Sequence, residues 1–167
     1  YLRTGNRKDN TVGSRSTSSQ FAYIAGFLDG DGSLMIQIKN RSDTKKGKRI
    51  MLTICFYQDT RHEKPLFWIR DILGCGYISR RNDGMTELRI NGFKTVEKVL
   101  KKLLPFIQFK KIQTELLLDS ASLLQKSLDD NSKRKLLKNI LLIQNENYVA
   151  RRKKSESELK ELLGLTP

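Results

Sequence analysis

The sequence predicts an α+β fold whose elements follow in the order α-β-β-α-β-β-α, with further helices after this core. Three patterns lead to that prediction. An apolar helical run begins behind a capping box near residue 18, two segments of alternating polarity follow it, and a helix, two shorter strands and another helix occupy residues 63–104. The 167 residues, with 38% hydrophobic content, are enough for one packed domain.

The first helix is predicted to begin near residue 18. Residues 17–20, Thr-Ser-Ser-Gln, have the form of a capping box. Apolar residues then recur at i, i+3, i+4 and i+7, and small residues on the other side would let a second helix approach closely. The helix runs into the sequence Gly-Asp-Gly at residues 30–32, where carboxylates at a helix end could hold a hard divalent cation.

Two longer and two shorter strands are predicted from alternation with a period of two. Residues 33–38 and 49–57 place leucine, isoleucine and phenylalanine on one face, and the polar, basic segment 40–48 forms the hairpin loop between them. The shorter strands, 77–81 and 86–91, flank an Asn-Asp-Gly turn. Each pair is therefore expected to be an antiparallel hairpin.

Five further helices are predicted from apolar spacing and from start and stop signals. Pro65 falls in the first turn of the first of them and Gly74 ends it, whereas Pro105 ends the second. The last opens with the capping sequence Ser155-x-x-Glu158. The segments predicted to be helical are 63–73, 96–104, 112–125, 133–144 and 155–163.

Composition divides the chain into a basic flexible arm at 1–16, a core at 17–128 and a helical extension at 129–167. The chain has 32 Lys and Arg against 18 Asp and Glu, a formal charge of +14, which predicts a polyanionic partner. Charge alone leaves ribosomal proteins, RNA chaperones and membrane-surface proteins open. Since only one histidine is present, a histidine-based nuclease is not expected, and no Ser/His/Asp or Cys/His site is readable.

Localisation and cofactors are predicted from what the sequence lacks. No apolar run reaches the length of a membrane span, so no membrane partner is expected. Cys55 and Cys75 lack metal-ligand spacing, and we expect reduced thiols in an intracellular protein, with organelle matrix and prokaryotic cytoplasm not distinguished. No small-molecule cofactor is expected.

The nine residues Ile24-Ala25-Gly26-Phe27-Leu28-Asp29-Gly30-Asp31-Gly32 resemble the signature of the LAGLIDADG homing endonucleases. All nine positions fit that pattern, and weaker resemblance covers residues 18–125. The resemblance implies an αββαββα core with a four-stranded antiparallel, DNA-binding saddle sheet in each subunit. Because the chain has one motif, it also implies a homodimer joined through the motif helices, and a long pseudo-palindromic target. The residues expected at the dimer interface are Ala22, Ala25, Gly26 and Asp29.

The resemblance further implies Mg²⁺-dependent hydrolysis of both DNA strands, leaving a staggered cut with 3′ overhangs. Asp31 carries over as the catalytic metal ligand, with the carbonyl of Gly30 as a second oxygen ligand. Gln58 and Lys110 stand where the family positions water and polarises phosphate, and His62 stands where a basic residue is expected. Mn²⁺ or Ca²⁺ could occupy the same site, Ca²⁺ without cleavage.

Alternation predicts which strand side chains face DNA. Since residues 34, 36 and 38 point to the core, their neighbours point away, and the same reasoning applies to the other strands. Gln can form hydrogen bonds with adenine, Arg or Lys can form them with guanine, and Glu can form them with cytosine. The residues predicted to face DNA are Met35, Gln37, Lys39, Arg41, Arg49, Met51, Thr53, Cys55, Tyr57, Arg61, Ser79, Arg81, Glu87 and Arg89.

Two other functions fit the same scaffold. One is an intron maturase, an RNA-binding splicing cofactor, and the other is a non-catalytic DNA-binding regulator with a degenerate motif. The intact Asp31, together with Gln58 and Lys110, favours the nuclease, since a pure binder has no need of clustered metal chemistry.

Overall fold

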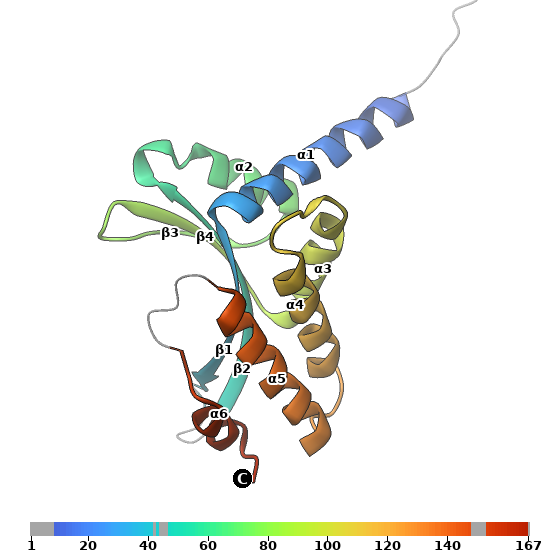
Figure 1. Cartoon of the computed structure of the whole chain (residues 1–167). Coiled ribbons are helices and arrows are strands. Elements are labelled where there is room, and N and C mark those ends of the chain that lie inside the picture. Colours follow the sequence, from blue (N-terminus) through green and yellow to red (C-terminus); the bar gives the residue numbers. More distant parts are fainter. Residues whose placement is uncertain (1–8, 42, 44–46, 148–152, 167) are drawn as a thin grey trace, which may run out of the picture.

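The computed structural model describes residues 9–41, 43, 47–147 and 153–166. In these ranges the order of elements confirms the predicted αββαββα core followed by further helices (Figure 1). The elements are α1 (Asp9–Asp31), β1 (Gly32–Asn40), β2 (Lys48–Asp59), the 3-10 turn η1 (Thr60–His62), α2 (Lys64–Leu73), β3 (Tyr77–Arg80), β4 (Met85–Asn91), α3 (Phe93–Leu103), η2 (Leu104–Phe106), α4 (Lys111–Leu124), α5 (Asp130–Glu146) and α6 (Glu156–Leu163).

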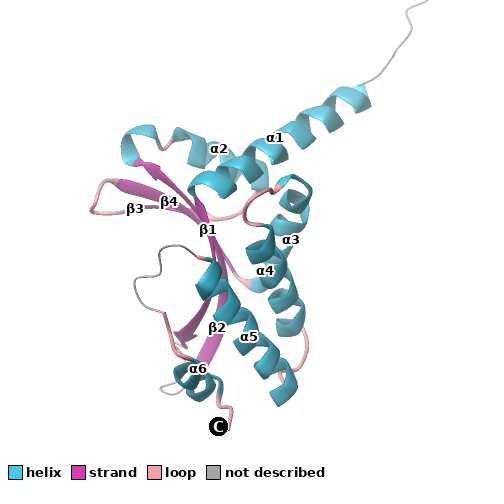
Figure 2. Cartoon of the chain, viewed as in Figure 1, coloured by secondary structure: helices cyan, strands magenta, loops and turns pink. Residues whose placement is uncertain are grey.

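The four strands form one antiparallel sheet in the order β1-β2-β4-β3. The register places Ile54 of β2 opposite Leu34 on one side and Ile90 on the other, and all three side chains are buried. Helices α3, α4 and α5 lie along one side of this sheet (Figure 2). Val99 of α3 and Leu117 of α4 belong to the same buried cluster, so the apolar strand face is the inner one.

Helix α1 begins at Asp9, so the prediction of a start near residue 18 is wrong. No proline separates residues 9–17 from the apolar run. Ser or Thr inside a helix lowers its stability by only about 0.5 kcal/mol relative to Ala. The capping-box sequence therefore lies within the helix. The segment predicted to be a flexible arm is helical from Asp9 onward, whereas residues 1–8 lie outside the described residues. The first turns of α1 extend away from the rest of the fold (Figure 1).

The junction between α1 and β1 needs glycine at position 32. A Cβ atom on Gly32 would lie 2.7 Å from the carbonyl oxygen of Leu28. Around Gly26 and Gly30, in contrast, no atom of the described residues outside the adjoining helix backbone lies within 4 Å of where a Cβ would stand. Helix α1 thus packs tightly at its end and leaves the side carrying these two glycines uncovered.

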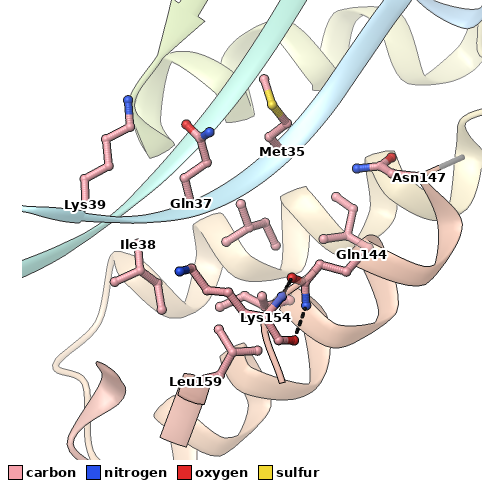
Figure 3. A pocket seen from close by; sticks show the side chains of 11 residues that line it. Met35, Gln37, Ile38, Lys39, Gln144, Asn147, Lys154 and Leu159 are labelled. Atoms are coloured by element: carbon pink, nitrogen blue, oxygen red, sulfur yellow. Dashed lines mark hydrogen bonds between the residues drawn. The ribbon is translucent and has the colours of Figure 1, made fainter. Parts of the chain in front are cut away.

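The C-terminal helices pack onto the core. Ile140 and Ile143 of α5 and Leu159 of α6 are buried in the same cluster as the strand residues. The Ser155 hydroxyl accepts from the N–H of Glu158, which confirms the predicted cap. Before it, the Lys154 backbone exchanges two hydrogen bonds with the Gln144 side chain (Figure 3). In the described ranges, none of the helices has the length and apolar character needed to cross a bilayer.

Candidate active site and DNA-facing strands

The last turn of α1 directs one aspartate into the protein and the other outward. Asp29 is 9% exposed, and its carboxylate accepts hydrogen bonds from the backbone N–H groups of Gln108 at 2.7 Å and Lys110 at 2.9 Å. Asp31, the last residue of the helix, is exposed. Asp29 therefore fastens the segment before α4 to the end of α1, and Asp31 is the carboxylate that a ligand can reach.

Lys110 lies at the same end of α1. Its Nζ donates to the carbonyl oxygen of Asp29 at 2.6 Å. Burial lowers the pKa of the Lys110 ammonium, while the negative charges of Asp29 and Asp31 oppose the shift. The structure thus brings Lys110 next to the helix end that carries Asp31, which is the neighbourhood predicted for it.

A cavity of about 600 Å³ opens beside this helix end. Gly30 and Lys110 line it, which places the predicted backbone ligand and the predicted lysine around one space. Its polar lining also includes Gln113, which the sequence analysis missed. The lining residues are Asp29, Gly30, Gly32, Ser33, Met35, Tyr57, Phe109, Lys110, Gln113, Glu146 and Asn147.

In the part of the chain that the structure describes, Gln58 and His62 do not line this cavity. The Gln58 side-chain carbonyl accepts from the N–H of Asp59 at 2.9 Å, at the end of β2. His62 is exposed in η1, a turn that the Asp59 carboxylate caps by accepting from the N–H of Arg61. The Arg61 guanidinium also holds the pKa of the Asp59 carboxyl well below its usual range. The roles of Gln58 and His62 therefore remain predictions.

The strand register confirms the predicted alternation. Met35 lies opposite Thr53, Gln37 opposite Met51, Lys39 opposite Arg49, Cys55 opposite Arg89, and Tyr57 opposite Glu87. In Figure 3, Met35, Gln37 and Lys39 point away from α5, whereas Ile38 points toward it. The predicted side chains of β1, β2, β3 and β4 therefore share one face, here called the polar strand face. Ser79 joins it opposite Glu87, and Arg81 follows directly after β3.

Two of these residues are inaccessible, which corrects their assignment. Thr53 and Cys55 each have 0% exposed surface. Thr53 donates to the Asn91 side chain at 2.8 Å, and burial raises the pKa of the Cys55 thiol to about 11. Alternation identifies the face of a strand but not the neighbours that cover it. Both residues support the polar strand face and offer no surface to DNA.

Glu87 also differs from its prediction as a reader of cytosine. It is 6% exposed, and its two carboxylate oxygens accept from Arg81 at 2.9 Å and Arg89 at 2.9 Å. Arg81 makes a second ion pair with Asp83 at 2.6 Å. Since its carboxylate is engaged, Glu87 orients two arginines on the polar strand face.

Arg41 directly follows β1 and pairs with Asp43 at 2.7 Å. The Arg41 guanidinium lowers the pKa of the Asp43 carboxyl through its hydrogen bonds. Both side chains are more than half exposed, so this pair restrains Arg41 only weakly.

Three members of the polar strand face escaped the sequence analysis. Tyr77 lies opposite Arg89 and is 50% exposed, and its hydroxyl accepts from the Asn91 side chain at 3.3 Å. Ser33 exchanges a hydrogen bond of 3.0 Å with the Tyr57 hydroxyl, whose pKa burial raises to about 12. Extending the alternation by one step at the end of each strand would have found Ser33, Tyr77 and Asn91.

The residues predicted at a dimer interface divide between the two sides of α1. Gly26 is exposed and Ala22 is partly exposed. Ala25 has 0% exposure and faces the core of the chain, and Asp29 accepts hydrogen bonds from backbone N–H groups. The structure therefore corrects the interface prediction for Ala25 and Asp29 and leaves Ala22 and Gly26 available.

Large apolar side chains are exposed near the open side of α1. Tyr23 is 57% exposed and packs edge-on against Trp68 of α2, with ring centroids 5.5 Å apart. Phe109, which follows the residue fastened by Asp29, is 84% exposed. Exposed aromatic pairs such as Tyr23 and Trp68 are typical of surfaces that a protein partner covers.

The donor groups at the end of α1 suit a hard cation that keeps part of its water shell. No cluster of three or more His, Cys, Asp or Glu side chains that could hold a metal occurs in the part of the chain that the structure describes. The described chain therefore supplies the exposed Asp31 carboxylate and backbone oxygens. Mg²⁺ is commonly held by one or two carboxylates together with phosphate oxygens and water. The Asp31 carboxylate and the backbone oxygens at the end of α1 fit this mode of Mg²⁺ coordination.

Known proteins share this sequence pattern. Residues 24–119 match a family model described as LAGLIDADG endonuclease. The chain is 38% identical over 99 residues to the DNA endonuclease I-CvuI of Chlorella vulgaris, across 59% of this chain and 62% of that protein. It is 33% identical over 96 residues to the DNA endonuclease I-CreI of Chlamydomonas reinhardtii, across 58% of each. The matched part thus spans about six-tenths of these curated relatives.

Solved structures resemble the fold over nearly its whole length. A crystal structure of I-CvuI with the I-CreI target in 2 mM Mg, in which the DNA is not cleaved, superposes with a TM-score of 0.80 at 28% identity, covering 91% of this chain and 99% of that one. Another I-CvuI structure, bound to its own target in 2 mM Ca, gives a TM-score of 0.78 at 27% identity, covering 92% and 99%.

Proposed function

Because the chain belongs to the LAGLIDADG endonuclease family, whose model matches residues 24–119, we propose that it is a site-specific, Mg²⁺-dependent endonuclease that cuts double-stranded DNA as a homodimer. The observation that carries the proposal is the exposed Asp31 carboxylate at the end of α1, next to a cavity lined by Lys110. Asp31 does not itself line this cavity, but its neighbour Gly30 does. A carboxylate and an ammonium near one helix end suit the chemistry of a phosphodiester.

The polar strand face supports DNA as the partner. Lys39 and Arg49 pair in register at one end of the sheet, and Arg81 and Arg89 meet at Glu87 at the other. With a formal charge of +14, the chain suits a polyanion over a neutral partner. Antiparallel strands with outward polar side chains can enter a major groove and contact base edges.

The uncovered side of α1 supports a homodimer. Gly26 and Gly30 leave room there for a second helix, and Tyr23 with Trp68 supplies apolar surface to bury. A two-fold axis along this side would bring one Asp31 from each subunit toward the same stretch of duplex. One Asp31 per strand is the simplest arrangement for cutting both strands.

In the proposed reaction the residues at the end of α1 have two roles, metal binding and contact with the scissile phosphate. Asp31 and the Gly30 carbonyl would hold Mg²⁺, which when bound makes a water more acidic and stabilises the departing 3′ oxygen. Lys110 donates from Nζ to the Asp29 carbonyl at 2.6 Å, and its remaining N–H donors would contact the phosphate. A water oxygen forms a bond to phosphorus and the bond to the 3′ oxygen breaks, leaving a 3′ hydroxyl and a 5′ phosphate on staggered strands with 3′ overhangs.

A cleavage selection from a randomised DNA library tests the proposal. The protein is incubated with the library in Mg²⁺, Mn²⁺ or Ca²⁺, with Mg²⁺ extended above the 2 mM at which the I-CvuI complex was uncleaved. We expect cleaved products that share one pseudo-palindromic sequence and carry 3′ overhangs, in Mg²⁺ and Mn²⁺ but not in Ca²⁺. A protein that cuts no library member yet binds intron RNA tightly would be a maturase instead.

A further inference from the structure

Gln113 is a buried polar residue with an unmet hydrogen-bonding requirement. It lies on α4, one turn after Lys110, and is 6% exposed. In the described protomer its Oε1 atom is buried and has no hydrogen-bond partner. A buried amide oxygen without a partner is destabilising, and buried acceptors in folded proteins are nearly always paired. A partner for this oxygen is therefore expected in the space next to it.

That space is the cavity beside the end of α1. Gln113 and Lys110 both line it, and Lys110 is the cap residue directly before α4. The lining also carries the hydrogen-bonded hydroxyls of Ser33 and Tyr57, so the cavity is polar. At about 600 Å³ it is large enough to hold several waters.

The Lys110 ammonium has further N–H donors available beside this cavity. An ammonium carries three N–H donors, and one of them is directed at the Asp29 carbonyl. A water can accept from one of the remaining N–H donors and donate to the Gln113 oxygen. Such a bridge would satisfy Oε1 and restrain the ammonium from a second direction.

We propose that Gln113 is a positioning residue for DNA cleavage, whose Oε1 accepts a hydrogen bond from a water held between it and the Lys110 ammonium. The inference rests on the proposed function and adds to it a residue that contacts neither DNA nor the metal ligands. Gln113 acts through Lys110, by fixing where the ammonium meets the scissile phosphate.

Three variants test this role. Gln113→Met keeps the length of the side chain and removes the acceptor, Gln113→Glu keeps an acceptor, and Glu115→Met changes an exposed residue of the same helix. The single-turnover cleavage rate and the DNA affinity in Ca²⁺ are measured for each. Gln113→Met should cleave roughly 10- to 100-fold more slowly, as loss of an outer-shell partner commonly does, with affinity unchanged within about twofold.

Gln113→Glu should recover most of the rate, and Glu115→Met should match the wild type. A crystal structure of the wild-type protein should place a water about 3 Å from Gln113 Oε1. The inference is overturned if Gln113→Met cuts at the wild-type rate, if Gln113→Glu is no better than Gln113→Met, or if that water is absent. A wild-type protein that cuts no DNA would instead overturn the proposed function.

Discussion

The end of α1 and the polar strand face would serve the proposed reaction in different ways. At the end of α1 one exposed carboxylate, Asp31, lies two residues after Asp29, whose carboxylate accepts two partly buried hydrogen bonds from backbone N–H groups. On the sheet, the side chains proposed to contact DNA are distributed over four strands, and Glu87 accepts hydrogen bonds from Arg81 and Arg89. A single change should therefore be decisive at the helix end and graded on the sheet.

The largest effect is expected from Asp31→Asn. The amide removes the negative charge needed to hold a divalent cation, so cleavage should fall by at least about 10⁴-fold, the scale seen when a directly acting group is removed from other hydrolases. Because Asp31 is exposed, folding and DNA binding should persist. Rates and affinities are compared with those of Asp130→Asn, an exposed acid on α5. Cleavage by Asp31→Asn near the wild-type rate would exclude Asp31 as the metal ligand.

Salt should weaken DNA binding steeply, because the proposed function spreads the affinity over many phosphate contacts. If about six to ten phosphates are contacted, affinity should fall roughly 10³- to 10⁵-fold between about 50 and about 200 mM salt. Arg49→Ala, at an exposed position on β2, should lower the slope of the log–log plot by about one. Affinity that hardly changes with salt would contradict a surface that follows the DNA backbone.

Asp29→Asn should act on stability first. It weakens two hydrogen bonds to a carboxylate, at 2.7 and 2.9 Å, that fasten the segment before α4. We expect the free energy of unfolding to fall by about 1 to 3 kcal/mol, measured by urea denaturation. Asp31→Asn serves as the matched control, two residues along. Equal stability of the two variants would remove the distinction between an inner and an outer aspartate.

Glu87→Gln should blur base discrimination while leaving cleavage chemistry intact. The amide pairs less strongly with Arg81 and Arg89, so both guanidinium groups gain freedom. The free energy of discrimination at the bases they face should drop by about 1 kcal/mol, since a well-placed arginine contributes about 1 to 3 kcal/mol of discrimination against the wrong base. Competition binding with singly substituted targets measures it. Unchanged discrimination would mean that these arginines contact only phosphates.

Cys55→Ala should have the smallest effect on DNA. With 0% exposure, the Cys55 side chain offers no surface to a base. Affinity and discrimination should remain within about twofold of the wild type, while removal of buried volume lowers stability by about 1 kcal/mol. A change of sequence preference would show that the sheet opens on binding and exposes this position.

Local patterns in the sequence predicted the elements and their faces well. The period of two placed Met35, Gln37 and Lys39 on the same outer face, and Gly74 ends α2 in a left-handed conformation with φ of 69°. Both features depend on residues close together in the chain. The start of α1 at Asp9 was missed because a capping box is a local signal that a longer helix can override.

Features set by distant residues escaped prediction. Cys55 alternates correctly, yet its burial depends on side chains of neighbouring strands. Ala25 has the small size expected at a helix–helix contact, but in the folded chain its side chain is buried in the hydrophobic core. Gln113 gave no signal, since its unpaired oxygen becomes visible only when α4 packs beside the end of α1.

A mixed dimer tests most directly the claim that each subunit contributes one Asp31 to the cutting of one strand. Wild-type and Asp31→Asn subunits with different affinity tags are co-expressed, and the doubly tagged dimer is incubated with a supercoiled plasmid carrying the selected target. We predict nicked circles from the mixed dimer, linear DNA from the wild type and uncut plasmid from the double variant. Linear DNA from the mixed dimer at the wild-type rate would contradict the account.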